Sequence, residues 1–454
     1  MGLGSTARKI VGRALLAAAL LGASRASLAQ PPANPPLSAS PAPAQPPITP
    51  PAADPTTPVP LPAAAPATTA APRGVAAVPR VQSAIEALAQ DAREYAAQNG
   101  VALDEAMRRL RAQEESVAAT DRIRDIYSDR LAGVAIEHKP DYRIVVLLTG
   151  NDPVAPQSIA AGGMTVPIVF RTGAPASGAA IIAAMRAHQA KIRALLPSAG
   201  MGLDQRSGEL VVIAKDGDIE EMGAPVEVDA ALEALTGVPV RVQPMQRKQV
   251  DLEIEGGSRV VGAFESSGRR YACTTGFVVT DGARTGIVTA AHCPDMLTYF
   301  DPDGATTELE FIGEWGARYQ DVQIHVSPAA QKPLFYAASD KRTARRLTSW
   351  RNRSSTRAGD AVCHRGETTG YSCSQVELTD YAPPRDLCGG PCEPLWVTVK
   401  GPNCRSGDSG GPIFNTTIAF GIVKGGSYER DGTCSFYYYM STDYLPAGWS
   451  LLHG

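Results

Sequence analysis

The sequence contains no apolar run of 18 or more residues, which excludes an ordinary membrane-spanning helix. It also lacks a strong excess of charge, because 43 basic and 46 acidic residues leave a net charge of −3. A polybasic protein that binds nucleic acid is therefore disfavoured. Cysteine is missing from the first 272 of the 454 residues, and all 8 cysteines lie between Cys273 and Cys434. This asymmetry excludes a single uniform domain.

The N-terminus has the three-part layout of a secretory signal peptide. Arg8, Lys9 and Arg13 form a basic start, a short apolar run follows at 14–22, and a small residue, Ala29, ends the segment. The apolar run is too short for a membrane anchor, so we expect a signal peptide at residues 1–29. The protein is therefore expected to be secreted, into the periplasm or out of the cell.

Two further segments precede the cysteines. Residues 30–77 are rich in proline and alanine, with 16 prolines between Pro31 and Pro72, and this composition predicts a disordered linker. Residues 78–250 change to helical periodicity, at 81–117 and 179–196, and to apolar runs typical of strands, at 142–148, 166–170 and 209–214. We expect an α+β region here, without cysteine and without an evident catalytic cluster.

The part of the chain with the cysteines, residues 251–454, has short β-rich runs separated by Gly, Pro and Asp turns. Such runs at 276–280, 286–289, 321–326, 395–399, 418–423 and 436–440 predict an all-β barrel or sandwich. In an exported protein, an even number of cysteines indicates disulfides. A zinc site would need a second close pair beside Cys388 and Cys392. We therefore expect no metal, and no other cofactor.

Two motifs contain candidate catalytic residues. The sequence TAAHC at 289–293 places His292 just after a strand, and GDSGGP at 407–412 places Ser409 between glycines. A nucleophilic serine needs a base beside it and backbone amides that receive the developing oxyanion, which flanking glycines allow to come close. A buried carboxylate must also hold the histidine in the correct tautomer.

Taken together, these motifs resemble the chymotrypsin-like serine proteases. The sequences CTTGF at 273–277 and CHRGETTGYSC at 363–373 narrow the resemblance to the bacterial streptogrisin and α-lytic protease branch, over about 200 residues from Val250 onwards. The resemblance implies an all-β, double six-stranded barrel. It also implies catalysis by Ser409 and His292, with an oxyanion hole formed by the amides of Gly407 and Ser409.

Four aspartates are candidates for the carboxylate that orients His292. Asp295, Asp301 and Asp303 lie in a Pro/Gly-rich turn just after His292. Asp321 instead begins the apolar strand expected at 322–326. The family places its triad aspartate at the head of such a strand, so we expect Asp321 to complete the triad.

The resemblance also implies disulfides and a substrate-binding segment. The expected pairs are Cys273 with Cys293, Cys363 with Cys373, and Cys404 with Cys434, which leaves Cys388 with Cys392. Substrate is expected to contact Ser406, Val423, Lys424, Gly425 and Gly426.

The sequence departs from the family pattern at two positions. Lys424 stands where the family usually has a serine beside the triad aspartate, and we expect it to point outwards, because burying an ammonium group is costly. His364 replaces the arginine that pairs with the carboxylate before the nucleophile. Arg365 is the expected partner of Asp408 instead.

We therefore predict a secreted, monomeric serine endopeptidase that acts on proteins or peptides. Residues 78–250 are expected to be a propeptide, an intramolecular chaperone and inhibitor that the enzyme itself removes by a cut between residues 245 and 260. The alternatives are a binding domain that stays attached and a binding protein on a protease scaffold without catalysis. No acidic residue is placed to attract basic side chains, so we expect a preference for substrates with apolar or small side chains at the cleaved bond. Lys424 and Arg405 leave acidic side chains as the alternative. The basic stretch at 341–357 is expected to be a solvated face.

Overall fold

The computed structural model describes residues 79–245, 250–251, 258–264, 270–301, 306–340, 342–384 and 387–454. The expected signal peptide and linker therefore lie outside the described residues. Within these ranges, no helix is both long and apolar enough to cross a membrane.

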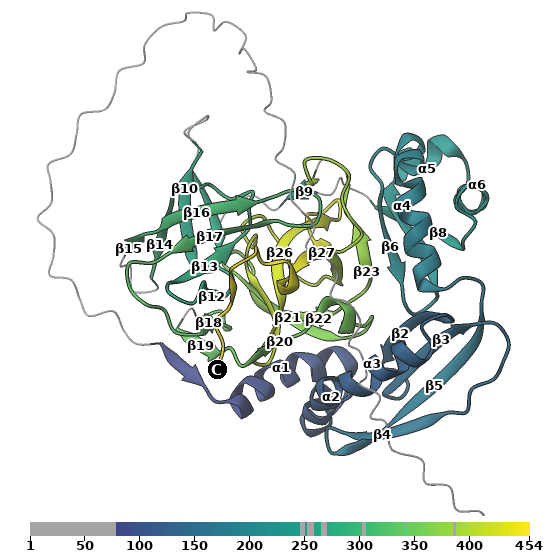
Figure 1. The fold of residues 1–454 in the computed structure, drawn as a ribbon, viewed down its shortest axis with the longest axis horizontal. Helices are drawn as coiled ribbons and strands as arrows, with labels where there is room; N and C mark the ends of the chain where they lie inside the picture. Colours follow the sequence, from purple (N-terminus) through teal and green to yellow (C-terminus); the bar gives the residue numbers. More distant parts are fainter. Residues whose placement is uncertain are drawn as a thin grey trace, which may run out of the picture. The chain divides into compact units, whose positions relative to one another are not determined.

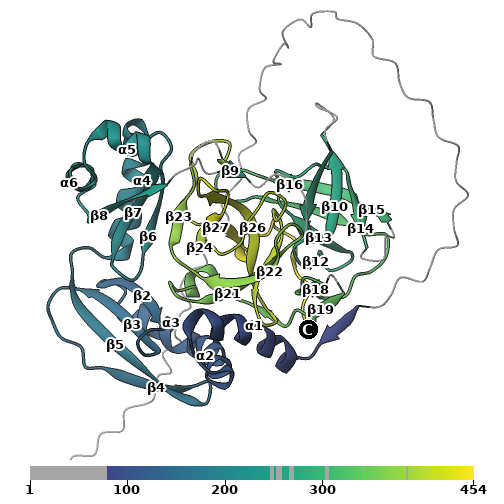
Figure 2. The same cartoon turned by 180° about the vertical axis from the view of Figure 1, so that it is seen from behind.

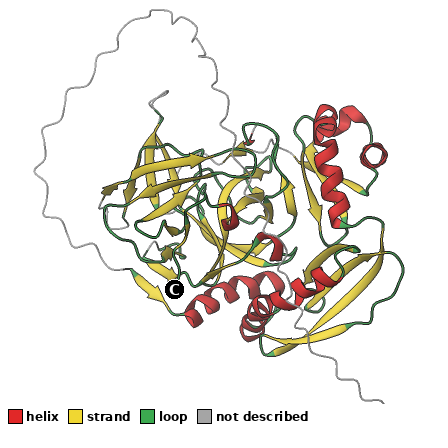
Figure 3. Ribbon diagram, in the orientation of Figure 1, coloured by secondary structure: helices red, strands yellow, loops and turns green. Residues whose placement is uncertain are grey.

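After a short first strand, β1 (Arg80–Gln82), the described chain forms three helices and a four-stranded sheet (Figure 1 and, by type of element, Figure 3). A capping box of Ser83 and Glu86 starts the first helix, and Gly100, in the left-handed conformation, ends it. Buried side chains of the sheet, among them Ile144 and Val146, pack against Ala112 and Ile123 of the helices. The elements are α1 (Ala84–Asn99), α2 (Leu103–Glu115), α3 (Val117–Ile126), β2 (Leu131–Glu137), β3 (Arg143–Thr149), β4 (Gln157–Ala161) and β5 (Met164–Ala174).

A second α+β segment follows, and its sheet includes a strand from the cysteine-containing part of the chain. The strands run in the order β23-β6-β7-β8, and β23 pairs antiparallel with β6 (Figure 2). The elements are α4 (Gly178–Leu195), β6 (Gly200–Asp204), β7 (Glu209–Lys215), α5 (Asp216–Met222), α6 (Pro225–Thr236), β8 (Val240–Met245) and β23 (Thr379–Ala382). The sequence predicted the helix at 179–196 and the strand at 209–214, but not the pairing with β23.

The remaining strands form two halves. The first half contains a four-stranded sheet in the order β11-β10-β14-β15 and a five-stranded sheet in the order β16-β17-β13-β12-β28. Its strands are β10 (Arg259–Ala263), β11 (Arg270–Thr274), β12 (Val278–Thr280), β13 (Thr285–Thr289), β14 (Leu297–Phe300), β15 (Thr306–Glu308), β16 (Glu310–Trp315), β17 (Val322–Val326) and β28 (Ser450–Leu451).

The second half is an eight-stranded sheet, in which β9 and β20 both pair with β26. Its strands are β9 (Val250–Asp251), β20 (Ser349–Trp350), β21 (Ala361–Gly366), β22 (Gly370–Gln375), β24 (Val397–Lys400), β25 (Pro412–Asn415), β26 (Ile418–Tyr428) and β27 (Cys434–Ser441). A separate small sheet joins β1 (Arg80–Gln82) to β19 (Thr343–Arg346) and β18 (Leu334–Tyr336).

Four disulfides stabilise these two halves. The structure joins Cys273 to Cys293, Cys363 to Cys373, Cys388 to Cys392, and Cys404 to Cys434. These are the four pairings that the resemblance implies. No described cysteine is free.

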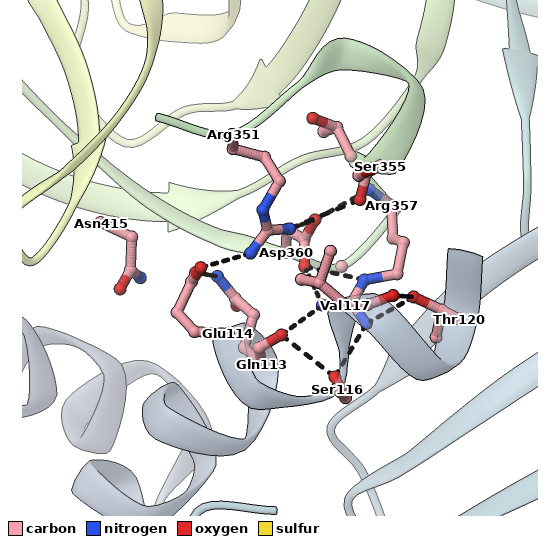
Figure 4. A network of polar contacts seen from close by, with 12 residues as sticks. Gln113, Glu114, Ser116, Val117, Thr120, Arg351, Ser355, Arg357, Asp360 and Asn415 are labelled. Atoms are coloured by element: carbon pink, nitrogen blue, oxygen red, sulfur yellow. Dashed lines mark hydrogen bonds and ion pairs between the residues drawn. The ribbon is translucent and has the colours of Figure 1, made fainter. Parts of the chain in front are cut away.

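The basic stretch at 341–357 is only partly the expected solvated face: Arg342 and Arg346 are exposed, whereas the prediction is wrong for the arginines that are buried. Arg345, Arg351 and Arg357 are buried, and helices α1 to α3 supply much of their polar surroundings. Glu114 accepts a hydrogen bond from Arg351, and Asp360 lies between the guanidinium groups of Arg351 and Arg357 (Figure 4). The sequence of this basic stretch alone could not predict that carboxylates more than two hundred residues away, those of Asp91 and Glu114, would pair with its arginines.

A buried histidine, His138, lies at the same contact. Its Nδ1 is 2.6 Å from the Tyr95 hydroxyl, and its Nε2 is 2.7 Å from the carbonyl oxygen of Gly359. Burial lowers the pKa of His138 from 6.5 to about 4. The folded state therefore favours the neutral ring.

We expect this histidine to make the fold less stable in acid. Because its folded pKa lies below its unfolded pKa, its contribution is complete above pH 6.5 and is lost as the pH falls towards 4. The loss amounts to roughly 3 kcal/mol. Urea unfolding at several pH values should show a shallower acid dependence for His138→Gln than for wild type. The exposed His453→Gln serves as control. Equal slopes for wild type and His138→Gln would contradict the assignment.

Candidate active site

The structure brings His292 and Asp321 together at the ends of neighbouring strands. His292 follows β13, and Asp321 immediately precedes β17, which pairs antiparallel with β13. The Nδ1 atom of His292 is 2.9 Å from Oδ2 of Asp321, and the backbone amide of His292 donates to Oδ1 at 3.2 Å. The carboxylate therefore holds both the ring and the backbone of His292 in place.

Ser409 lies on the other side of the imidazole. Its Oγ atom is 2.9 Å from Nε2 of His292, so serine, histidine and aspartate form one line of contacts from three distant parts of the chain. In this line, Nδ1–H faces the carboxylate and Nε2 is available to accept the serine proton.

The loop that carries Ser409 is held between the two halves. The amide of Thr274 donates to the carbonyl oxygen of Ser409, and its hydroxyl donates to that of Gly407, both at 2.8 Å. Gly410 has a φ of 81°, and a Cβ atom there would lie 2.2 Å from the Thr289 hydroxyl oxygen, so only glycine fits. Thr274 lies within the CTTGF motif at 273–277, but the motif alone did not predict its contacts with the Ser409 loop.

Lys424 points inwards, contrary to the prediction. It is 2% exposed, its Nζ atom lies 3.4 Å from Oδ2 of Asp321, and it stands 5.4 Å from the centre of the Trp396 ring. Burial alone would raise the pKa of Asp321, but the charges of His292 and Lys424 hold that pKa below its ordinary value. The cost of burying the ammonium group is offset by the carboxylate and by the aromatic face.

Asp408, which precedes Ser409, does not form the predicted ion pair with Arg365. It accepts hydrogen bonds from the amide and hydroxyl of Thr369 and from the amide of Arg405. The histidine in the family's arginine position, His364, lies 3.9 Å away, and Arg365 forms its ion pair with Glu367. Uncharged donors, the amide and hydroxyl of Thr369 and the amide of Arg405, thus satisfy Asp408 in place of the expected arginine side chain.

The expected substrate-binding segment is partly occupied by the chain itself. Strand β9 pairs antiparallel with β26, so that Val250 lies opposite Gly426 and Asp251 lies opposite Gly425. Val423 lies on the same strand, and its amide donates to the carbonyl oxygen of Gly411. Ser406 lines a shallow pocket with Thr368, Arg405, Tyr428 and Gly432.

The other candidate aspartates lie elsewhere. Asp295 is exposed, Asp301 lines a separate cavity of about 620 Å³, and Asp303 lies outside the described residues.

One cluster among the described residues has side chains that could bind a metal ion, namely Asp91 with Cys363 and Cys373. Its two sulfur atoms form a disulfide, so they cannot act as thiolate ligands.

The two β-sheet halves, with His292, Asp321 and Ser409 between them, agree with the expected chymotrypsin-like fold, which is confirmed. The C-terminal part of the chain is similar to the chymotrypsin-like serine proteases of bacteria. No family model matches the sequence.

The chain is similar to several individual proteins. The chain is 29% identical over 189 residues to streptogrisin-C of Streptomyces griseus, a match that covers 40% of this chain and 36% of that protein. It is also similar to the structure of Thermobifida fusca protease A, with 21% sequence identity and a TM-score of 0.35, over 44% of this chain and 99% of that one. The structure of Nocardiopsis protease is similar with 20% identity and a TM-score of 0.31, over 41% of this chain and 92% of that one. The match thus spans little more than a third of the curated relative's length.

Proposed function

We propose that this protein is a secreted serine endopeptidase that is made as a precursor and cuts itself. The line of contacts from Asp321 through His292 to Ser409 carries the proposal, with both key distances at 2.9 Å. An aligned serine and imidazole with a buried carboxylate behind them suits acyl transfer at a peptide carbonyl.

In the proposed reaction, Ser409 Oγ attacks the carbonyl carbon of the scissile bond while Nε2 of His292 takes the hydroxyl proton. The amides of Gly407 and Ser409 donate hydrogen bonds to the oxyanion. His292 then gives its proton to the leaving amine as the C–N bond breaks. Water, activated by His292, hydrolyses the acyl-enzyme, and Asp321 stabilises the imidazolium at each step.

The pairing of β9 with β26 suggests how a peptide is bound. An extended peptide would add antiparallel to Gly425 and Gly426 through main-chain hydrogen bonds, as Val250 and Asp251 do. Ser406 and Val423 are proposed to lie on either side of the bound peptide. We propose that the enzyme prefers substrates with apolar or small side chains at the cleaved bond. Lys424 supports this choice, since its charge is directed at Asp321 rather than at the substrate.

Residues 78–250 are proposed to be the propeptide that assists folding and blocks the site. Three contacts support this role: β9 on β26, β23 in the sheet of β6, and the carboxylates of Asp91 and Glu114 on buried arginines. Strand pairings between such distant segments form slowly, and a prefolded template would speed them. While β9 occupies Gly425 and Gly426, substrate cannot.

A fluorophosphonate probe tests the proposed catalysis, because it reacts with an activated serine. We expect the mature wild-type protein to be labelled on the peptide that contains Ser409, and a Ser409→Ala variant to remain unlabelled. A wild-type protein that is no more labelled than this variant would favour the alternative, a binding protein on a protease scaffold.

The position of the self-cut can be predicted more narrowly than from sequence. Asp251 is still paired with the substrate-binding strand, whereas Arg259 already belongs to β10 and pairs with β11. The cut should therefore fall between residues 251 and 258. Mass spectrometry of the secreted protein should find a new N-terminus within 252–258. A mature chain that still begins near Gln30 would contradict the proposal.

A further inference from the structure

Lys424 is a buried cation at the catalytic cluster, in a position where the family resemblance leads one to expect a neutral serine. Its Nζ atom and Nδ1 of His292 both approach the same oxygen, Oδ2 of Asp321, at 3.4 and 2.9 Å. Its carbonyl oxygen lies 3.5 Å from Oγ of Ser409. Lys424 is thus near all three catalytic groups without occupying the reaction path.

The charges around this oxygen can be named. On the described elements packed around the carboxylate, the titratable groups facing it are His292 and Lys424, with Glu314 of β16 farther out. Burial, together with Asp295 and Asp321, raises the pKa of Glu314. The ammonium group of Lys424 is therefore the one fixed positive charge described at the carboxylate.

Two cations that share one carboxylate compete for it. When His292 is neutral, Lys424 and Asp321 form a balanced pair. When His292 takes up a proton, a second positive charge enters the same buried site, and the ammonium group opposes it. With a neutral side chain at position 424, the negative charge of Asp321 would stabilise the imidazolium without opposition from a second cation.

We propose that Lys424 is a positioning residue that shares Asp321 with His292, disfavours the charged imidazolium in the free enzyme, and so extends proteolysis to lower pH. This proposal rests on the proposed function, because the affected proton is the one that His292 must lack in order to accept another from Ser409. It gives a reason for an expensive buried lysine that packing alone does not supply.

The pH profile of kcat/KM tests the proposal. In Lys424→Met, which keeps the length of the side chain, we expect the acid limb to move up by about one pH unit. The ratio of kcat/KM below this limb to kcat/KM on the alkaline plateau should then be about tenfold lower than in wild type. Lys424→Ser should shift the limb in the same direction, and Lys424→Arg should keep it in place. Lys400→Met removes the same charge from an exposed position and should leave the profile unchanged.

A second readout does not depend on activity. In the full chain with Ser409→Ala, the ¹⁵N signals of the His292 ring should titrate at higher pH when Lys424 is replaced by methionine. The proposal would be overturned if a folded Lys424→Met protein showed the same acid limb of kcat/KM as wild type and its His292 ring titrated at the same pH. A wild-type protein without peptidase activity would overturn the proposed function instead, and the ring titration would still judge the role of Lys424.

Discussion

Replacing Ser409 by alanine is expected to lower kcat for peptide hydrolysis by about 10⁴- to 10⁶-fold. In the proposed mechanism this hydroxyl forms the acyl-enzyme, and its Oγ atom is the one that contacts Nε2 of His292. Any residual rate would come from substrate binding and from the oxyanion amides, which the variant keeps. Steady-state hydrolysis of a chromogenic peptide measures the effect.

The same substitution should leave the precursor uncut. If the enzyme processes itself, the Ser409→Ala chain keeps residues 78–250, whereas wild type releases them. A matched control is Ser349→Ala, which removes an exposed serine hydroxyl from β20 and should retain activity and processing. A fully active Ser409→Ala protein would rule out the proposed nucleophile, and a normally processed but inactive one would show that another protease makes the cut.

The cluster of Ser409, His292 and Asp321 could be predicted from sequence because each residue lies in a short local pattern. Glycines around Ser409, a strand before His292 and a strand after Asp321 can all be recognised within about ten residues. The same applies to α4 and β7, whose apolar periodicity is regular. In these cases the information is local, and the structure places the elements where the pattern predicts them.

Long-range polar contacts could not be predicted in this way. The inward turn of Lys424 depends on Asp321 and Trp396. Asp408 does not pair with Arg365, because Thr369 and the amide of Arg405 already donate hydrogen bonds to it. General costs of burial predict that a lone charge stays at the surface. They do not reveal which distant partner will compensate it.

The ion pair of Asp91 and Arg345 joins α1 to the C-terminal part of the chain and is almost fully buried, so it should be costly to break. Asp91 of α1 is 1% exposed and Arg345 of β19 is 0% exposed. The two terminal nitrogens of the Arg345 guanidinium group donate to the carboxylate of Asp91, at 2.8 and 2.9 Å. Asp91 also accepts from the Tyr371 hydroxyl and from the Thr416 amide, so one side chain satisfies three donor groups of the C-terminal part.

We expect Asp91→Ala to destabilise the docking of α1 by about 3–5 kcal/mol, because it leaves a guanidinium group buried without its counter-charge. Hydrogen exchange of the α1 amides in the Ser409→Ala chain, which is expected to remain intact, should then be about 10²- to 10³-fold faster. Replacing both partners, as Asp91→Leu with Arg345→Met, should recover much of the protection, since no charge is then left buried. Asp104→Ala, which breaks an exposed ion pair with Arg108, is the control and should change little. Unchanged protection in Asp91→Ala would mean that apolar packing, rather than this ion pair, holds α1 in place.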